Sequence, residues 1–231
     1  MLNRIENLQK WLLSSNYGKY LLEQEKQFYF NACERVFGYY ALQLGFPQID
    51  FLENNRINNK YTLGYDIRCK LDSLPFVSNS VDLIVCPHII ELSPDNWMET
   101  LQECHRVLIP NGHLIITSFN KFSLFQMWNL CQGEFASLKL QPLYKVKKAL
   151  TDEQFRLSGG SFLSYLPPSN SNKFLNSNTW IDHAGNRWLP SLANMYTLRA
   201  TKVITSVTPM VIPTKNKAKT QKQLESVQFK K

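Results

Sequence analysis

Two short apolar runs and one amphipathic segment dominate the middle of the chain. Residues 81–85 read Val-Asp-Leu-Ile-Val, and residues 113–117 form a second apolar run. Runs this short are typical of strands that are buried on both faces of a parallel sheet. Between the two runs, apolar side chains recur at steps of four, three and four from Trp97 to Leu108, which is the spacing of one helical face. The pattern predicts a strand–helix–strand crossover between parallel neighbours.

Both ends of this helix carry recognisable signals. Ser93-Pro94-Asp95 places an N-cap residue, a proline and an acidic side chain at the predicted first turn. Pro110-Asn111-Gly112 ends the helix and turns the chain.

In open α/β sheets, ligands bind outside the carboxyl ends of the strands. Here those ends are residues 86–88 and 118–120.

The flanking segments predict further elements of both kinds. We expect helices over residues 2–39 with a break at 14–18, over 151–157 and over 173–183. We expect strands over 40–44, which ends at Gly45, and over 61–67, 162–166 and 195–207. The alternation of strands and helices indicates an α/β protein.

Composition and cysteine usage narrow the class of protein to which the chain can belong. The 231 residues are 44% hydrophobic and 13% aromatic, as expected for a packed globule. No apolar run approaches the roughly 18 residues of a membrane span, and the charges among residues 4–10 argue against a signal peptide. The five cysteines form no CxxC pair, so neither a zinc site nor a disulfide framework is predicted. Free thiols favour a cytoplasmic location.

The net charge of +8 is concentrated at the C-terminus. Residues 215–231 carry six lysines against one glutamate, and so contribute +5. A solvated, disordered tail is the simplest interpretation. A weak electrostatic contact with nucleic acid or an acidic membrane is the alternative, but no basic–aromatic motif supports it.

Several short motifs follow one another through the middle of the chain. They are Leu74-Pro75-Phe76, Asp82-Leu83-Ile84-Val85, His88-Ile89-Ile90-Glu91, Arg106-Val107-Leu108 with Pro110 and Gly112, and Phe119-Asn120. In this order they resemble the type 11 branch of the class I S-adenosylmethionine-dependent methyltransferases. Segments toward both ends resemble a proteobacterial subgroup of that branch with a degenerate glycine-rich motif, so the resemblance covers about residues 10–205.

The resemblance implies a Rossmann-like methyltransferase sandwich, and the spacing indicates that its N-terminal half is shortened. Only 28 residues separate Gly45 from Leu74. Two helices and two strands with their loops would need roughly 45 residues there. We therefore expect three regions: an N-terminal helical segment (1–38), a methyltransferase-like domain (39–207) and a disordered basic tail (208–231).

The cofactor motif itself departs from the family pattern. In the family a glycine-rich turn follows the first strand, so that the backbone approaches the cofactor closely. Here the stretch is Gln43-Leu44-Gly45-Phe46-Pro47, which keeps one glycine of three and has glutamine at the acidic position. The family's adenine-contacting aspartate falls on Lys70, and Asp72 is its nearest substitute.

The resemblance implies a set of site residues around S-adenosylmethionine. Asn120 is expected on the substrate side, no metal ligand is expected, and no catalytic residue is assigned. His88 and Glu91 allow a proton-transfer role, but capping of the neighbouring loop or helix is the plainer interpretation. The residues expected to bind the cofactor are Gly45, Asp72, Leu74, Cys86 and His88.

Two functions remain open on these grounds. The first is methyl transfer from S-adenosylmethionine to an unknown acceptor. The second is a methyltransferase-like scaffold that no longer binds the cofactor and acts as an interaction or regulatory module, as the lost glycines and the shortened half suggest. A cleft for the adenosyl group beside Gly45 is the geometric condition for the first function.

Overall fold

The computed structural model describes residues 2–67, 69–132, 138–178 and 180–203, so the predicted tail lies outside the described residues. The helices are α1 (Leu2–Ser14), α2 (Asn16–Cys33), α3 (Ile89–Leu92), α4 (Trp97–Val107), α5 (Leu124–Gln132), α6 (Leu143–Asp152), α7 (Asn172–Ser177), α8 (Trp180–Trp188) and the 3-10 turn η1 (Pro190–Leu192). The strands are β1 (Tyr40–Leu44), β2 (Asn59–Leu63), β3 (Val81–Pro87), β4 (Leu108–Phe119), β5 (Phe155–Leu163) and β6 (Met195–Lys202).

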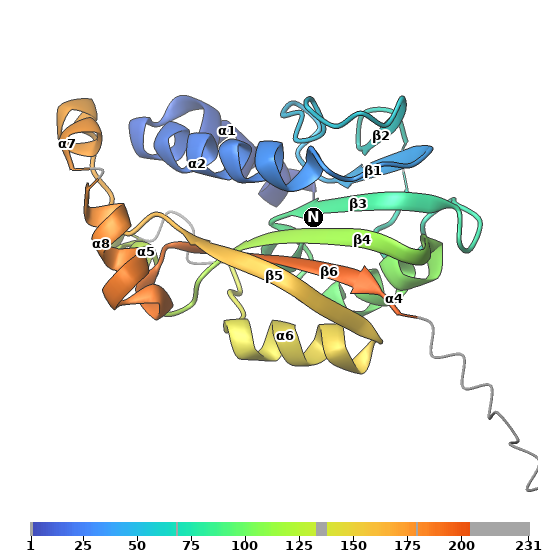
Figure 1. Cartoon of the computed structure of the whole chain (residues 1–231). Helices are drawn as coiled ribbons and strands as arrows, with labels where there is room; N and C mark the ends of the chain where they lie inside the picture. Colours follow the sequence, from blue (N-terminus) through green and yellow to red (C-terminus); the bar gives the residue numbers. More distant parts are fainter. Residues whose placement is uncertain (1, 68, 133–137, 179, 204–231) are drawn as a thin grey trace, which may run out of the picture.

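The six strands form one mixed sheet in the order β2-β1-β3-β4-β6-β5 (Figure 1). The first four strands in this order are parallel, whereas β6 runs antiparallel to both β4 and β5. β3 and β4 are parallel neighbours with α4 between them in the chain. The predicted crossover is therefore confirmed, and so is the α/β class.

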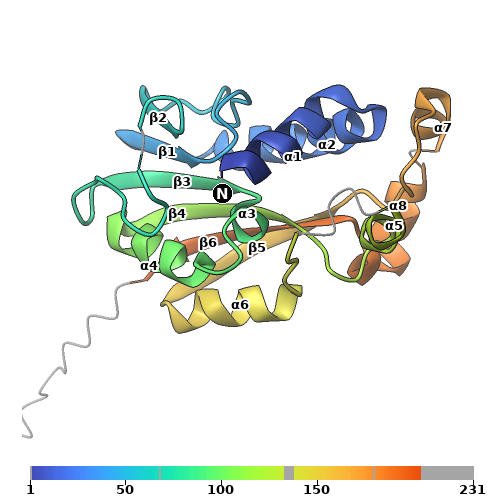
Figure 2. The same ribbon diagram turned by 180° about the vertical axis from the view of Figure 1, so that it is seen from behind.

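Helices cover both faces of the sheet (Figures 1 and 2). α1 and α2 lie on one face, and α4 and α6 lie on the other. The side chains of β3 alternate between two cores: Leu83 and Val85 pack with α1 and α2, while Ile84 and Cys86 pack with α4 and α6. This double burial explains why the 81–85 run is apolar almost throughout.

The N-terminal helices divide at Ser15, within the predicted break. The Ser15 hydroxyl accepts a hydrogen bond from the Gly18 amide at 2.9 Å, which caps the start of α2. Buried side chains along α2 include Leu21, Tyr29 and Ala32, which face the sheet. This confirms the apolar stripe that the sequence predicts.

The N-terminal half of the sandwich is shortened, as predicted. Between Gly45 and Leu74, β2 is the single strand and no helix occurs among the described residues. The loop that leads to β2 contributes Ile49, Phe51 and Leu52 to the core beneath α1 and α2. These side chains bury apolar surface that a helix would otherwise cover.

The C-terminal half differs from the sequence expectation. β5 spans Phe155–Leu163 and so overlaps both the helix expected at 151–157 and the strand expected at 162–166. β5 pairs with β6 on both sides of a bulge between Leu157 and Gly159, and these cross-strand bonds are not visible in a local pattern. The helix expected at 173–183 is two helices, α7 and α8.

The last strand begins at Met195 as predicted, and its described part ends at Lys202. The Lys202 ammonium donates to the Leu108 carbonyl and to the Asn79 side-chain oxygen, each at 2.7 Å. This places the end of β6 beside the amino end of β4. The domain boundaries at residues 38 and 207 stay predictions.

Candidate functional site

The carboxyl ends of β1 and β3 form the rim at which the sequence places the cofactor. Gly45 follows β1 with a φ of 95°, a conformation that favours glycine. A Cβ atom at this position would lie 3.8 Å from the Pro87 carbonyl oxygen and 3.9 Å from the Leu92 side chain. Two of the predicted segments, 45 and 86–88, therefore meet at this rim.

Gln43 organises the loop that follows Gly45. Its side chain is buried, and its Nε2 donates to the carbonyl oxygens of Gly45 (3.0 Å), Phe46 (3.2 Å) and Ile49 (2.7 Å). Its Oε1 accepts from the Phe51 amide at 2.9 Å. A carboxylate has no proton to donate to three carbonyl oxygens, so an amide at the family's acidic position suits this loop.

Phe46 occupies the space beside Gly45. Its side chain is fully buried, and its ring meets the His88 ring edge-on with centroids 5.5 Å apart. The residue has a φ of 49°, in the left-handed region, which aryl side chains adopt at a cost. The buried Phe46 ring therefore packs at the rim, directly after Gly45, where the sequence predicts the cofactor cleft.

His88 lies at the centre of a buried cluster of ionisable groups. Its Nδ1 is 3.1 Å from Glu91 Oε1, and its Nε2 is 3.4 Å from Glu25 Oε2. The Thr117 hydroxyl donates to Glu25, the Tyr29 hydroxyl lies 3.2 Å from that of Thr117, and the Phe119 amide donates to Glu91. All the side chains of this cluster are buried, and they join α2, α3 and the ends of β3 and β4.

The two carboxylates determine the charge of His88. Burial by itself lowers the pKa of this imidazole, because desolvation disfavours the charged form. The nearby charges of Glu25 and Glu91 outweigh burial and raise the pKa to about 10. His88 is therefore an imidazolium between two acidic side chains at neutral pH. The cluster links α2 electrostatically to the rim.

Three other predicted residues lie on the α4 side of the sheet. Asp72 accepts a 3.2 Å hydrogen bond from Asn96, just before α4. Leu74 is buried, and its amide donates to Glu103 while its carbonyl accepts from Arg106. Cys86 is buried, and desolvation raises the pKa of its thiol well above the usual value. The Leu74 and Cys86 side chains both belong to the core beneath α4, not to the side of the sheet where Phe46 packs.

Asn120 has a local structural role in this structure. Its amide donates to the carbonyl oxygens of Ser191 (2.7 Å) and Ala193 (2.9 Å), and its Oδ1 accepts from the Phe122 amide at 3.2 Å. These bonds tie the start of α5 to the turn before β6. The role of Asn120 toward a substrate stays a prediction.

The sequence interpretation missed Glu25, although a signal was present. Glu25 lies four residues after Leu21 and four before Tyr29, on the stripe that α2 buries. A charged residue within an apolar helical stripe is unusual, because a buried charge needs a partner. That irregularity could have indicated a buried ion pair, but the sequence does not say with which residue.

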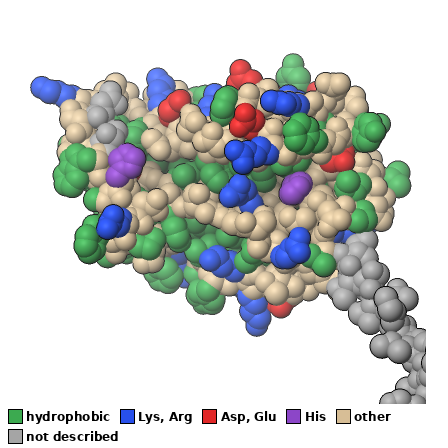
Figure 3. Space-filling model, in the orientation of Figure 1, with side chains coloured by type: hydrophobic (Ala, Val, Ile, Leu, Met, Phe, Trp, Pro, Cys, Tyr) green, Lys and Arg blue, Asp and Glu red, His purple; other side chains and the backbone are tan. Residues whose placement is uncertain are grey.

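Surface charge and helix composition bear on the charge-based alternatives. On the face shown in Figure 3, several lysine and arginine side chains lie in the middle of the molecule, with apolar and other side chains between and around them. Across the described ranges, no helix is both long and apolar enough to cross a membrane. Within the same ranges, no group of three or more histidine, cysteine, aspartate or glutamate residues could hold a metal ion.

The comparisons with known proteins agree with the fold. Residues 27–116 match the family model described as "Methyltransferase domain", a span that runs from α2 into β4 and includes the whole rim. The match covers less than half of the chain. Comparison with curated proteins gives no significant match.

Solved structures resemble the chain over most of its length. A chain from the complex between the Haloferax volcanii Trm112 methyltransferase activator and a protein described as a methyltransferase has a TM-score of 0.59 at 12% identity, covering 86% of this chain and 97% of that one. A SAM-dependent methyltransferase from Archaeoglobus fulgidus has a TM-score of 0.58 at 14% identity, covering 84% and 97%. The [4+2]-cyclase SpnF has a TM-score of 0.52 at 14% identity, covering 78% and 80%.

These likenesses establish the architecture: the chain has the α/β fold of the SAM-dependent methyltransferases. The cyclase shows that the same fold also occurs in a protein named for a different reaction. The fold alone therefore does not identify the reaction, which depends on the residues at the carboxyl ends of β1 and β3.

Proposed function

We propose that this chain is an S-adenosylmethionine-dependent methyltransferase whose rim at Gly45 opens to admit the cofactor. The observation that supports it is the family match over residues 27–116, which includes β1, Gly45, β3 and His88. The methyl acceptor stays unknown.

In this proposal the backbone of the rim contacts the cofactor. Gly45 has no side chain, and a Cβ there would meet no atom closer than 3.8 Å, so the chain can approach a ligand closely at this point. The carbonyl oxygen of Pro87 and the side chain of Leu92 lie nearest to this position. Asp72, Leu74 and Cys86 are proposed as the adenine-side border, through backbone groups in the case of Leu74 and Cys86, whose side chains are buried in the core beneath α4.

The bound cofactor supplies an electrophilic methyl group on a sulfonium. The work of the chain is then to align the acceptor and to exclude water. For this to happen the Phe46 ring has to leave the rim. Because Phe46 packs on His88, and His88 is paired with Glu25, that movement also involves α2.

The second candidate is a scaffold that does not bind the cofactor. It is favoured by one specific observation, the complete burial of Phe46 and His88 at the rim. Such a scaffold would act through a partner. One neighbour of the same fold occurs in a complex with the Trm112 activator, which is consistent with a protein partner for either candidate.

Calorimetric titration with S-adenosylmethionine and S-adenosylhomocysteine distinguishes the two candidates. The enzyme proposal expects a Kd of about micromolar order for the wild-type chain. Phe46→Ala removes the side chain that fills the rim, so we expect tighter binding by about tenfold or more. Tyr39→Ala, which truncates an aromatic side chain that is 78% exposed and precedes β1, at the end of that strand opposite Gly45, is the matched control and should leave the affinity unchanged.

Heats that stay flat to about millimolar ligand in the wild type would reject the enzyme proposal. If Phe46→Ala alone then bound the cofactor, the wild type would be a scaffold whose site is closed by a single side chain. If the wild type and both variants bound the cofactor with equal affinity, Phe46 would not close the site.

A further inference from the structure

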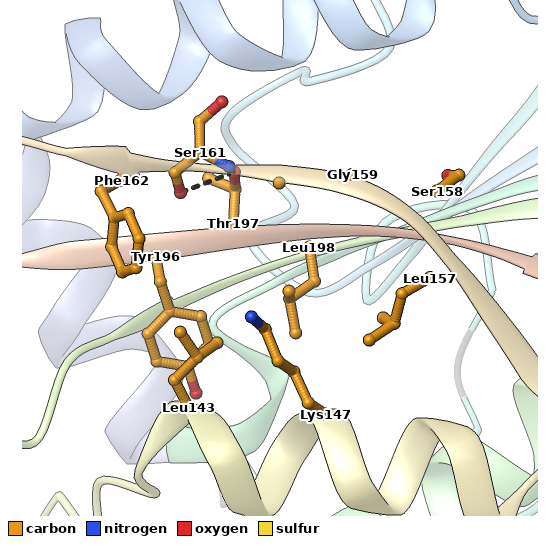
Figure 4. A pocket seen from close by; sticks show the side chains of 11 residues that line it. Leu143, Lys147, Leu157, Ser158, Gly159, Ser161, Phe162, Tyr196, Thr197 and Leu198 are labelled. Carbon is orange, nitrogen blue, oxygen red and sulfur yellow. Dashed lines mark hydrogen bonds between the residues drawn. The ribbon is translucent and has the colours of Figure 1, made fainter. Parts of the chain in front are cut away.

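A hollow between α6 and the β5–β6 pair stands apart from the rim (Figure 4). Its volume is about 450 Å³, which lies within the range of small-molecule sites. It opens on the α4–α6 side of the sheet. Its lining residues are Leu143, Lys147, Leu157, Phe162, Tyr196 and Leu198, with the backbone of 158–161.

One strand position that lines the hollow is a glycine. Gly160 pairs with Leu198, between Leu157 and Phe162 on the strand. A Cβ atom at Gly160 would overlap the Thr197 carbonyl oxygen, so glycine is required there by the backbone. Gly160 therefore adds no side chain to the hollow.

Most side chains that line the hollow on the α6 side are apolar. The polar groups of Ser161 and Thr197, on the two strands, already form hydrogen bonds with each other. The Ser161 amide donates to the Thr197 hydroxyl at 2.8 Å, and that hydroxyl donates to the Ser161 carbonyl at 3.0 Å. Leu198 and the ring of Tyr196 are buried and form the floor. An apolar body can lie on this floor without leaving a paired polar group unsatisfied.

Lys147 is the one charged residue that lines the hollow. Figure 4 shows its amine between α6 and β6, near Leu198 and Tyr196. Within the described residues no hydrogen bond or ion pair of this ammonium occurs, whereas Lys145 on the same helix donates to Gln141 at 3.1 Å. No acidic residue lines the hollow. The site thus combines one unpartnered cation with apolar walls.

We propose that this hollow binds a small organic carboxylate with a flat aromatic or short aliphatic body. The body would lie on Leu198 and Tyr196, and the carboxylate would pair with Lys147. The solvent-exposed Lys147 is the one charged side chain of the lining, beside the hydroxyl residues Ser158, Ser161 and Thr197, and a single ammonium suits one carboxylate better than a phosphate group, which recruits several charged donors. The absence of carboxylates from the lining argues against a metal cation. The proposal does not depend on cofactor binding.

The test uses 2-naphthoate and its uncharged analogue 2-naphthalenemethanol as probes, titrated while amide chemical shifts are followed by NMR. We expect 2-naphthoate to bind with a Kd below about 1 mM and to shift the amides of Gly159, Gly160 and Leu198. The alcohol should bind the same amides roughly tenfold more weakly, because it lacks the charge-assisted pair.

Lys147→Met should weaken 2-naphthoate binding roughly tenfold and leave the alcohol unaffected. Lys148→Met removes the next charge on α6, which does not line the hollow, and should change neither. Leu143→Trp should fill the hollow and weaken both probes.

Absence of shifts at Gly159, Gly160 and Leu198 would overturn the proposal, and so would equal binding of the two probes by the wild type. An equal effect of the Lys147 and Lys148 substitutions on 2-naphthoate would show a general charge effect and would also overturn it. Because the acid and the alcohol are compared on the wild-type chain, the outcome does not depend on the folding of any variant.

Discussion

At the scale of single residues, Gln43 sets the conformation of the loop after β1. Its amide meets three carbonyl oxygens, and its own oxygen accepts from the Phe51 amide. The substitution relative to the methyltransferase motif therefore has a structural cause. A loop built on an amide donor at this position holds Phe46 over the rim.

Gln43→Glu should be strongly destabilising. The new carboxylate would face three carbonyl oxygens without a proton to donate, so we expect a loss of about 2–4 kcal/mol in the free energy of unfolding. Gln48→Glu, on the exposed part of the same loop, is the control and should change it by less than about 0.5 kcal/mol. Urea unfolding measures both, and equal midpoints for the two variants would contradict this role of Gln43.

The sequence identified Gln43 as a departure from the motif and Gly45 as its one retained glycine, but it did not predict the hydrogen bonds that Gln43 makes. The three acceptors of Gln43 converge because Phe46 adopts a positive φ, and no local pattern predicts that conformation for an aromatic residue. The filling of the rim by Phe46 follows from the same turn. The location of the cofactor site at Gly45 stays a prediction, whereas the burial of Phe46 there depends on backbone angles that only the structure supplies.

At the scale of elements, α2 is fastened to the ends of β3 and β4 by the Glu25–His88–Glu91 cluster. The cluster is satisfied in part by Thr117, and the Tyr29 hydroxyl lies alongside. Removing one member of a buried charge network leaves the others unpaired, which is costly. α2 should therefore be held most firmly when His88 is protonated.

The stability of the chain should fall between pH 7 and pH 8.5. The folded-state pKa of His88, about 10, lies above the usual value of 6.5 for an unfolded chain. The stabilisation that comes from protonated His88 is fully present below pH 6.5 and is lost above pH 10. Between these two values, its loss lowers the free energy of unfolding by about 1.4 kcal/mol for each unit that the pH rises. Burial also raises the pKa of Cys33, to about 12, but unfolded thiols ionise mainly above pH 8.5.

The measurement is the free energy of unfolding at pH 7.0, 7.75 and 8.5. His88→Gln should abolish most of the slope as well as lower the stability. His183→Gln alters an exposed histidine on α8 and should retain the wild-type slope. A wild-type free energy that is constant across this window would show that His88 is not charged in the folded state.

The sequence predicted α2 and its apolar stripe correctly, but not its electrostatic attachment. Glu25 and His88 lie 63 positions apart in the chain, and the contact arises only when α2 packs over β3. Periodicity describes one element at a time. Pairs between elements therefore require the packing itself.

At the scale of the whole molecule, one sheet supports two cores. Leu12 is fully buried in the core beneath α1 and α2, and Leu101 is fully buried in the core beneath α4. Both cores use side chains of β3. Loss of either core exposes one face of the same strands, so the two halves of the sandwich should unfold together.

Leu12→Ala and Leu101→Ala should each lower the free energy of unfolding by about 2–5 kcal/mol. Leu130→Ala, at a position that is 66% exposed, should change it by less than about 0.5 kcal/mol. In each case far-ultraviolet circular dichroism and tryptophan fluorescence should give coincident transitions. Two separate transitions in the Leu12→Ala variant would show that α1 and α2 form an independent unit.

The sequence was most informative where contacts are local or repeat a known crossover. The strand–helix–strand unit from β3 to β4 was predicted with its direction, because parallel strands need such a connection. β5 was misjudged, because its pairing with β6 lies across Gly159 and Gly160, which interrupt the apolar pattern. Cross-strand hydrogen bonds at the edge of the sheet leave little trace in the sequence.

The direction of β6 has a practical consequence for studying this protein. β6 runs against its neighbour β4, so Lys202 is bonded to Leu108, at the far end of the strands from Gly45 and His88. A reporter or capture tag fused directly after Val203 would therefore be attached at the pole opposite Gly45. Immobilised through such a tag, the chain would present the Gly45 end to the bulk solution, and ligand titrations could be read without obstruction by the support.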